Sequence, residues 1–426
     1  MMHWPDCRCS RLFRTGTGTL AIAIVVVLAA PACAQSTEPI KIGYSMSLTG
    51  GLAPNGRSAL LAQHIWEEET NAKGGMLGRP VRLIYYDDKS SPSEIPSIYT
   101  KLLDIDKVDL IIGAYGTALT APAMPIIMQR KKTFIGLMGL AVNSDFHYSN
   151  YFVIGPYGPD AKRAFTNGFF EVTLRQSPRP QSVAIVAADQ EFSRNAADGA
   201  RENAAKSALN VVYERTYPPA TADFSPILRA IAASNPDLVV VCSYPPDSVG
   251  IVRAVNEVGF TPKAIGGAMV GLQSPAIKAQ LGPLLNGIIN YEFWLPVPKM
   301  QFPGVTDLIS RYQARAPAEG VDPVGYYMPP WAYAQLQVLQ QAVEGTKSLD
   351  DAKLGDYIRA RPFSTVVGDI EFGAEGEWTH SRVLQVQYQN IKGRDLAQFK
   401  DMSTQVVVAP MEYASGALMY PYERAK

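Results

Sequence analysis

The chain has 426 residues, of which 47% are hydrophobic and 18% are charged, and its formal net charge is zero. This is an ordinary globular composition, long enough for about two domains of ~100–200 residues each. Neither a basic stripe nor an acidic tail is visible, which argues against nucleic acid and anionic membranes as partners.

The first 34 residues have the pattern of a secretory signal peptide. Arginines precede an apolar run from Leu20 to Ala30, which ends in Pro31-Ala32-Cys33-Ala34. A positive start, a short apolar middle and a small-x-small end predict cleavage after Ala34 and a periplasmic mature protein. Lipidation at Cys33 is the less favoured interpretation, because Ala30-Pro31-Ala32 matches a lipoprotein signal poorly. No later stretch reaches the ~20 unbroken apolar residues of a membrane span.

The first half of the mature chain alternates strands with helices. The patterns predict strands at 40–47, 81–86, 110–112 and from 133, with helices at 54–70, 92–104 and 117–128 between them. Such alternation predicts a parallel sheet with helices on both faces. Two of the strands end in Gly-containing loops, at 113–116 and 136–139. These loops should border the crevice in which open α/β sheets bind ligands.

A second alternating series follows a pause at 152–160. Its predicted helices lie at 161–174, 193–208, 224–234 and 248–258, and its strands at 182–187, 211–217, 238–242 and 287–293. Helices near 305–314, 331–343 and 350–359 and short strands at 365–367, 369–372 and 383–389 complete the core. The fold class is therefore α/β, with two Rossmann-like doubly wound lobes.

Pauses near residues 157, 294 and 376 predict three crossings between the lobes, which together form a hinge. We expect residues 35–157 plus 294–376 in lobe 1 and 158–293 plus 377–410 in lobe 2. Residues 411–426 are expected to form a C-terminal tail.

Signatures of enzymes are missing from the sequence. It contains no HExxH, G-x-S-x-G or P-loop motif, and the glycines at 266, 267 and 271 lack dinucleotide-binding spacing. Asp87-Asp88 could be a metal or acid/base pair, but acidic residues that cap a strand end are the simpler interpretation. Cys242 is the only cysteine beyond the first 34 residues, and its apolar strand favours a packed thiol. We therefore expect no catalysis.

Among the polar residues, Thr117 is the strongest candidate for a ligand-binding residue. Its hydroxyl and the first free amides of the predicted helix could bind an anion without a cationic side chain. An N-cap that serves only its own helix is an equally good interpretation.

Tyrosines at strand ends and lobe boundaries are the second feature, since tyrosine suits an interface that is half apolar and half wet. We expect about half of them to face the cleft. Met138, Leu140 and Met269 fall in matching loops, although core packing is the simpler interpretation for each. The candidate binding residues are Tyr44, Asn55, Tyr115, Gly116, Thr117, Met138, Gly139, Leu140, Tyr157, Tyr244, Met269 and Tyr327, and Tyr326 belongs to the same group of tyrosines.

Three phrases of the sequence carry a resemblance to a known family. IKIGYSMSLTGGLAPNG, NAKGGMLGRPVRLIYYDD and VDLIIGAYGTALTAPAMPI, in this order, resemble periplasmic solute-binding proteins of the leucine/isoleucine/valine-binding class. These are the receptors of ATP-driven (ABC) importers. The resemblance runs from about Ile40 to about Gln389. It implies a type I periplasmic binding fold, one ligand closed between two lobes, no cofactor, and a monomer that docks on permease subunits in the inner membrane.

The resemblance also implies roles for single residues. Thr117 matches a hydroxyl residue that binds the ligand carboxylate in amino-acid-binding members, and Tyr244 matches a tyrosine of the second lobe. Where these members have a second hydroxyl residue, this chain has Leu140. The place of the carboxylate that holds the ligand ammonium falls at Gly267-Ala268-Met269.

An ammonium taken from water without a partner loses several kcal/mol. We therefore expect a hydrophobic or aromatic carboxylate, or a neutral amide or ester, without an α-amino group. The alternatives are a receptor for branched-chain or other amino acids or amides, a ligand-sensing module of the same fold, and an exported hydrolase or lyase.

Overall fold

The structure is a computed structural model that describes residues 38–219 and 221–426, all of which belong to one unit of the fold. The predicted signal peptide, with its cleavage site and Cys33, lies outside the described residues.

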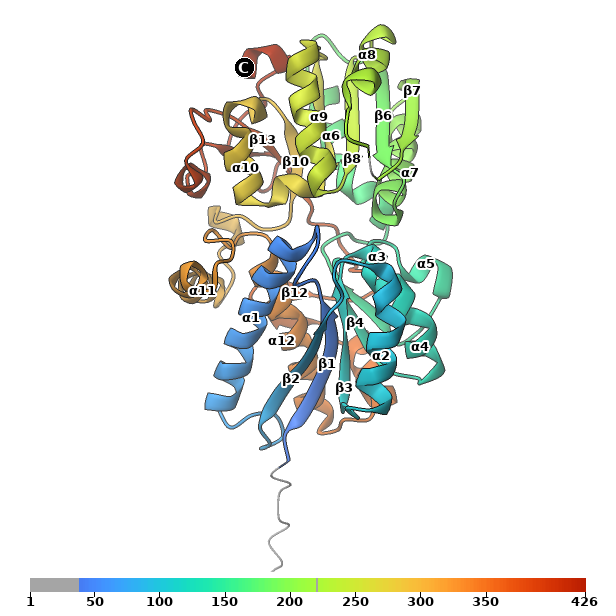
Figure 1. Cartoon of the computed structure of the whole chain (residues 1–426), viewed down its shortest axis with the longest axis vertical. Coiled ribbons are helices and arrows are strands. Elements are labelled where there is room, and N and C mark those ends of the chain that lie inside the picture. The colour runs from blue at the N-terminus through green and yellow to red at the C-terminus, as the bar shows by residue number, and fades with distance from the viewer. Residues whose placement is uncertain (1–37, 220) are drawn as a thin grey trace, which may run out of the picture. The chain divides into compact units, whose positions relative to one another are not determined.

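The first sheet consists of five parallel strands in the order β2-β1-β3-β4-β5 (Figure 1). Helices α1, α11 and α12 pack against one another in this lobe, and α2 packs against β1. The strands are β1 (Ile40–Met46), β2 (Val81–Asp87), β3 (Leu110–Tyr115), β4 (Phe134–Leu137) and β5 (Tyr151–Ile154), with a separate pair β11 (Phe363–Thr365) and β12 (Gly368–Ile370). The helices are α1 (Ala53–Ala72), α2 (Ile95–Asp104), α3 (Thr117–Thr120), α4 (Met124–Gln129), α5 (Asn143–Phe146), α11 (Val305–Glu319), α12 (Met328–Thr346) and α13 (Asp351–Ala360).

The second sheet has seven strands in the order β14-β13-β10-β9-β8-β6-β7. Its central pairings are parallel, and β13 and β14 add two antiparallel strands beside β10. The strands are β6 (Ser182–Ala188), β7 (Asn210–Tyr217), β8 (Leu238–Ser243), β9 (Ala264–Met269), β10 (Ile289–Glu292), β13 (Leu384–Tyr388) and β14 (Gln405–Ala409). The helices are α6 (Ala161–Leu174), α7 (Glu191–Lys206), α8 (Ser225–Ala233), α9 (Pro245–Val258) and α10 (Pro275–Leu281).

Short 3₁₀ turns connect several of these elements. They are η1 (Pro92–Glu94), η2 (Ala121–Ala123), η3 (Val270–Gln273), η4 (Gly282–Leu285), η5 (Pro298–Met300), η6 (Leu396–Lys400) and η7 (Tyr422–Ala425).

Both sheets reverse their winding direction at one point. In the first sheet β2 lies on one side of β1 and β3 on the other, and in the second β7 and β8 flank β6 in the same way. Loops at the carboxyl ends of the strands diverge at such a switch point and leave a crevice for ligands. The predicted α/β class with two doubly wound lobes is confirmed.

The chain passes between the two sheets in three segments, at 155–160, 293–304 and 371–383. The first and third segments are tied together, since the Arg382 amide donates to Pro156 O (2.8 Å) and Trp378 Nε1 donates to Val153 O (3.1 Å). The predicted pauses near residues 157, 294 and 376 fall inside these segments. The lobe bounds given above stay a prediction.

The single helix predicted at 117–128 is wrong in one respect: the structure breaks it into α3, η2 and α4. Pro122 and Pro125 lie at the first positions of η2 and α4. Proline lacks an amide proton, so it removes an intrahelical hydrogen bond and favours a new start.

The sequence patterns did not predict three of the strands, which are β5, β9 and β14. β5 has only four residues and runs into Gly155-Pro156. In β9, Gly266 and Gly267 interrupt the apolar pattern, yet a Cβ at Gly266 would lie 2.3 Å from the Ile289 carbonyl oxygen of β10. Glycine is needed there for close approach of the two strands.

Residues of the predicted C-terminal tail pack against the second sheet. Tyr422 is buried against the core of the second sheet, and its amide donates to Lys263 O (2.8 Å). Cys242 is buried in β8, where burial raises the pKa of its thiol to about 12, consistent with a packed thiol.

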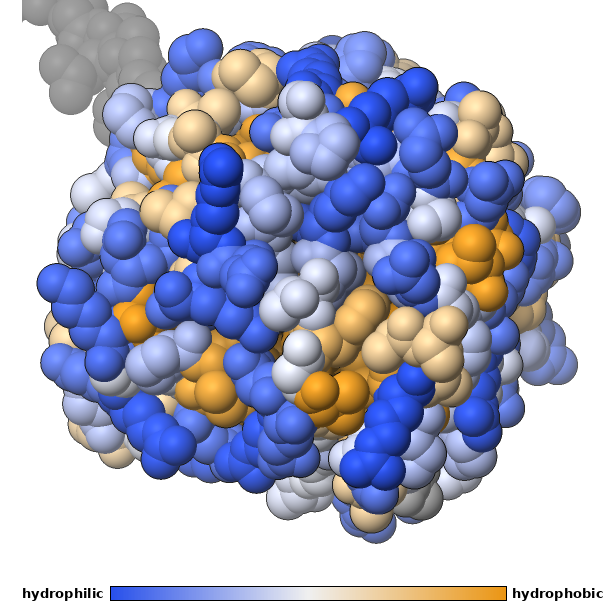
Figure 2. All heavy atoms as spheres, turned by 90° about the horizontal axis from the view of Figure 1, so that it is seen from above, coloured by the Kyte–Doolittle hydropathy of each residue, from blue (hydrophilic) through white to orange (hydrophobic). Residues whose placement is uncertain are grey.

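Figure 2 views the molecule from the end that carries α8 and α9 in Figure 1. Polar residues cover most of this face, and apolar residues appear in patches between them. Isolated exposed apolar side chains are normal on folded domains. Among the described residues, no helix combines the length and the apolar character that a membrane span requires.

Candidate ligand-binding site

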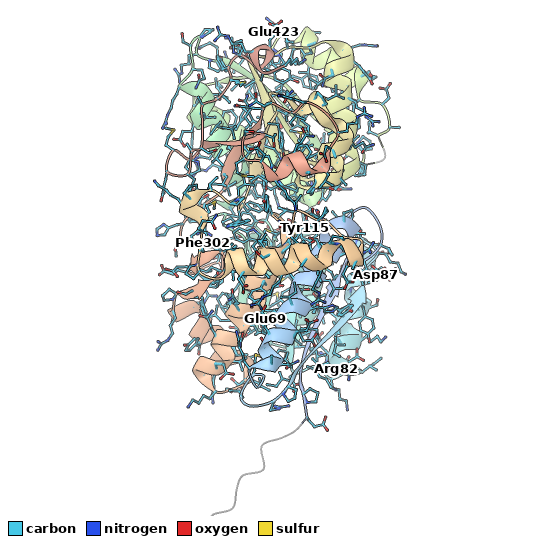
Figure 3. The ribbon with its side chains drawn as sticks, turned by 90° about the vertical axis from the view of Figure 1, so that its left-hand side faces the viewer. Glu69, Arg82, Asp87, Tyr115, Phe302 and Glu423 are labelled. Carbon is cyan, nitrogen blue, oxygen red and sulfur yellow. The ribbon has the colours of Figure 1, made fainter. Side chains whose placement is uncertain are left out.

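A cavity lies at the carboxyl ends of the parallel strands of both sheets, at the level of Tyr115 in Figure 3. The cavity is small, with a volume of about 30 Å³, and has no room for a ring-sized ligand in this arrangement of the lobes. Two lobes joined by a hinge can admit such a ligand by opening. The lining residues are Leu52, Tyr115, Gly116, Thr117, Ala118, Leu119, Met138, Tyr157, Phe165, Phe192, Tyr244, Val270, Tyr291, Phe293 and Tyr327.

The lining of this cavity is aromatic and uncharged. Eight of its fifteen residues are Phe or Tyr, and none is Asp, Glu, Lys, Arg or His. Phe165 lies at the centre of the aromatic cluster, with its ring centroid 4.8 Å from that of Tyr291 and 5.1 Å from that of Phe192. Ligand pockets are typically apolar with a few well-placed polar groups. Here those groups are tyrosine hydroxyls, the Thr117 hydroxyl and backbone atoms.

Thr117 connects two loops of the first lobe. Its Oγ1 accepts a hydrogen bond from the Leu140 amide (3.0 Å), so the hydroxyl proton remains to donate elsewhere. The interpretation of Thr117 as an N-cap is wrong, because Gly116 (φ 88°) holds that position and its helix has no side-chain cap. The first intrahelical bond runs from the Thr120 amide to Gly116 O (3.0 Å), which leaves the three preceding amides outside the helical ladder.

Three tyrosines join their hydroxyls across the cavity wall. Tyr327 Oη lies 3.4 Å from Tyr115 Oη and 3.3 Å from Tyr291 Oη, and Asn55 Nδ2 donates to Tyr115 Oη (3.0 Å). Burial raises the pKa of Tyr115 to about 12 and those of Tyr291 and Tyr327 well above their ordinary value. All three are therefore neutral hydroxyls at physiological pH.

Seven of the predicted binding residues line the cavity: Tyr115, Gly116, Thr117, Met138, Tyr157, Tyr244 and Tyr327. Tyr157 Oη donates to Met138 Sδ (3.5 Å), and burial raises the pKa of Tyr157 well above its ordinary value.

The other predicted residues lie behind the cavity wall or away from it. Tyr44 is buried in the first lobe with its ring centroid 5.8 Å from that of Tyr85, and Met269 packs in the core of the second sheet. Tyr326 packs on Trp294, with the centroids 5.6 Å apart. Asn55 reaches the site only through Tyr115. Gly139 and Leu140 are absent from the lining, although the Leu140 backbone bonds Thr117 and accepts from Asn195 Nδ2 (3.3 Å) of the second lobe.

Sequence reasoning missed four aromatic residues of the second lobe that line the cavity, namely Phe165, Phe192, Tyr291 and Phe293. Phe192 lies in the first turn of α7, directly after β6, and Phe165 lies in the second turn of α6. Tyr291 and Phe293 lie at the end of β10. Attention to the last residue of each predicted strand and to the loop before the next predicted helix would have found Phe293 and Phe192. No local signal distinguishes Phe165 from a core residue.

Charged side chains gather at the entrance of the cavity instead. A wider hollow of about 400 Å³ shares Leu52, Ala118, Leu119 and Tyr244 with the cavity and adds Asp189, Glu191, Arg194 and Asp247. Burial raises the pKa of Asp247 to about 6, and the Tyr217 hydroxyl, which donates to it (3.3 Å), only partly offsets this.

Asp87 and Asp88 lie at the end of β2 and accept hydrogen bonds from the loop that follows β1. Asp87 accepts from the Leu48 amide (2.9 Å) and the Thr49 hydroxyl (2.7 Å), and Asp88 accepts from the Ser47 hydroxyl (2.6 Å). In the part of the chain that the structure describes, no group of His, Cys, Asp and Glu could hold a metal ion.

Comparison with known proteins gives the family. The family described as "Periplasmic binding protein" matches residues 39–393. The Leu/Ile/Val-binding protein of Escherichia coli K12 is 24% identical over 345 residues, which span 80% of this chain and 88% of that protein.

Two solved structures show the same fold with different ligands. A branched-chain amino acid transporter substrate-binding protein of Streptococcus pneumoniae, in complex with isoleucine, superposes with a TM-score of 0.71 at 18% identity, covering 88% of this chain and 100% of that one. A solute-binding protein of an ABC transporter from R. palustris, in complex with 4-hydroxybenzoate, also gives 0.71 at 18% identity, covering 84% and 94%. These relatives are substrate-binding proteins rather than enzymes. The chain belongs to the periplasmic binding protein family, as an extracytoplasmic solute-binding receptor of an ABC importer with the two-lobed type I fold.

Proposed function

We propose that this receptor closes its two lobes on a small hydrophobic or aromatic carboxylate that lacks an α-amino group. The observation that carries the proposal is the lining of the cavity, which combines eight aromatic rings with no charged side chain. Aromatic rings favour flat or branched apolar ligands through burial and edge-to-face contacts.

A carboxylate can be bound here without a cation. The Thr117 hydroxyl proton is free to donate, and the amides that precede the first intrahelical bond of α3 lie beside it. Several hydrogen bonds to a carboxylate favour its ionised form. Gly116 and the first three residues of α3, Thr117 to Leu119, all line the cavity.

An ammonium group, in contrast, would have no partner in the cavity. Gly267, Ala268 and Met269 lie within β9 and supply no carboxylate. The acidic side chains of the entrance hollow do not line the cavity, and Asp189 among them is paired with Arg194 (2.7 Å). Leaving an ammonium unpaired in a closed cavity costs several kcal/mol.

The comparisons support both ligand classes, because one related structure holds isoleucine and another holds 4-hydroxybenzoate. A receptor for branched-chain amino acids is therefore the second candidate. The family implies permease subunits as partners, and the monomeric state stays a prediction. A sensing role would be favoured if a gene for a kinase or regulator, rather than genes for a permease and two ATPases, lay beside that of this protein.

In a thermal-shift screen we expect benzoates or phenylpropenoates to stabilise the protein and leucine and phenylalanine to leave it unchanged. A ligand present at a hundred times its Kd stabilises a protein by about 2.7 kcal/mol, which such a screen detects. Saturable stabilisation by leucine or phenylalanine, with none by the acids, would overturn the proposal. Recovery of the stabilising compound unchanged after incubation would exclude a hydrolase or lyase.

Replacing Thr117 by valine keeps the shape of the side chain and removes its hydroxyl. We expect the free energy of unfolding to fall by about 1–3 kcal/mol, because the buried Leu140 amide loses its acceptor. Affinity for the carboxylate, measured by calorimetry, should also fall about tenfold or more, since a charge-assisted hydrogen bond is lost. Thr117→Ser should restore both. Unchanged affinity with reduced stability would limit Thr117 to a structural role.

A further inference from the structure

The three cavity tyrosines bring their hydroxyl oxygens together from three separate segments. Tyr115 ends β3, Tyr327 precedes α12, and Tyr291 lies in β10 of the second sheet. The distances of 3.3 and 3.4 Å between these oxygens exceed the usual ~2.7–2.8 Å of an O–H···O bond. The hydroxyls are thus clustered but only weakly bonded to one another, so they can turn toward a ligand.

A count of protons shows what this cluster lacks. The three hydroxyl groups carry three protons, but only two contacts join their oxygens, so at most two protons can be donated within the cluster. Asn55 donates to Tyr115 Oη and therefore accepts none of these protons through that contact. At least one hydroxyl proton therefore has no acceptor among the described residues. A buried donor without an acceptor is costly, so the cluster favours a ligand that supplies an oxygen.

The missing acceptor should be uncharged. Burial keeps all three tyrosines neutral, and no cationic side chain lines the cavity. A second carboxylate would lose its hydration without a compensating charge. A hydroxyl suits the cluster best, because it accepts the remaining proton and donates its own to another oxygen.

We infer that Tyr115, Tyr327 and Tyr291 form a second polar subsite, which recognises an uncharged oxygen, above all a ring hydroxyl, on the aromatic part of the ligand. This inference rests on the proposed function, which places the ligand carboxylate at Thr117. The subsite is complete only when the lobes meet, since Tyr291 comes from the second sheet and the other two tyrosines from the first lobe. Tyr327 is its central residue, because both contacts between oxygens run through its hydroxyl.

Paired ligands test the subsite by calorimetry on the whole protein. The affinity of 3-hydroxybenzoate is compared with that of 3-methylbenzoate, and the affinity of 4-hydroxybenzoate with that of 4-methylbenzoate. A methyl group is similar in size to a hydroxyl group but cannot form a hydrogen bond. We expect one hydroxylated acid to bind at least about tenfold tighter than its methyl partner.

Tyrosine-to-phenylalanine variants then test whether the preference for the hydroxylated acid depends on the hydroxyl of Tyr327. Tyr327→Phe should reduce the ratio between the paired affinities to about one. Tyr99→Phe is the control, because Tyr99 donates to Ile112 O (2.9 Å) in the core of the first lobe, away from the cavity. This variant should keep the wild-type ratio. Should Tyr327→Phe fail to fold, Tyr291→Phe carries the same test.

The inference is overturned if the methylated acids bind as tightly as the hydroxylated ones in the wild-type protein, or if the ratio survives in the Tyr327 and Tyr291 variants. Tight binding of benzoate in those cases would leave the proposed function standing. Binding of none of these acids would refute the proposed function and the subsite together.

Discussion

Replacing Glu377 by glutamine is expected to stabilise the protein at pH 8 and to flatten the dependence of its stability on pH. Glu377 is buried in the third crossing between the lobes, and neither of its carboxyl oxygens has a hydrogen-bond partner among the described residues. Burial raises the pKa of this carboxyl to about 8, and the nearby Ala141 amide only partly offsets the shift.

The direction of the effect follows from proton binding. The folded protein keeps the Glu377 proton up to about pH 8, whereas the unfolded chain releases it near the ordinary glutamate pKa of 4.5. The contribution of the neutral carboxyl is fully present below pH 4.5 and is lost as the pH rises toward 8. Each unit of pKa shift corresponds to about 1.4 kcal/mol, so the loss should reach a few kcal/mol.

Urea unfolding at pH 5, 6.5 and 8 measures this effect. Glu375→Gln is the matched control, because Glu375 lies on the same segment, its side chain is 52% exposed, and its carboxylate pairs with the exposed His147 (3.2 Å). Its stability should follow the wild-type curve, while that of Glu377→Gln should decline less between pH 5 and 8. Parallel curves for Glu377→Gln and the wild type would show that Glu377 is not buried as the structure has it.

Replacing Lys278 by methionine should reduce the free energy of unfolding by about 3–5 kcal/mol, the cost of breaking a buried ion pair from one side. Lys278 Nζ lies 3.0 Å from Glu292 Oε1 and 2.6 Å from Gln405 Oε1, joining α10, β10 and β14. The side chains of the pair are only 5% and 2% exposed. Without Lys278, Glu292 would be a buried carboxylate with no counter-charge.

Removing both charges should restore most of the lost stability. The double variant Lys278→Met with Glu292→Leu leaves no unpaired charge, and well-packed apolar substitutes for a buried pair are often neutral. Arg130→Met, which breaks the exposed pair with Asp104, should change the urea midpoint little. A double variant as unstable as Lys278→Met alone would indicate that packing, rather than charge, explains the loss.

Local sequence patterns were enough to predict the fold class and one side of the candidate site. Alternating strand and helix patterns and glycines at strand ends are local features, so they identified the two lobes and the loop from Tyr115 to Thr117. Local patterns fail where an element is short or broken, as in β5 and in the helix divided at Pro122 and Pro125.

Which aromatic rings line the cavity depends on contacts between distant segments of the chain. Tyr44 and Tyr115 both lie in strands of the first sheet, yet one packs in the core and the other lines the cavity, because side-chain direction depends on where the strand ends and what covers it. The tyrosine subsite shows the same limit. Tyr115 and Tyr327 are 212 residues apart in the chain, and Tyr291 and Tyr327 are 36 apart. Their hydroxyls meet because the hinge brings two separately wound sheets face to face, and no local sequence pattern encodes that approach.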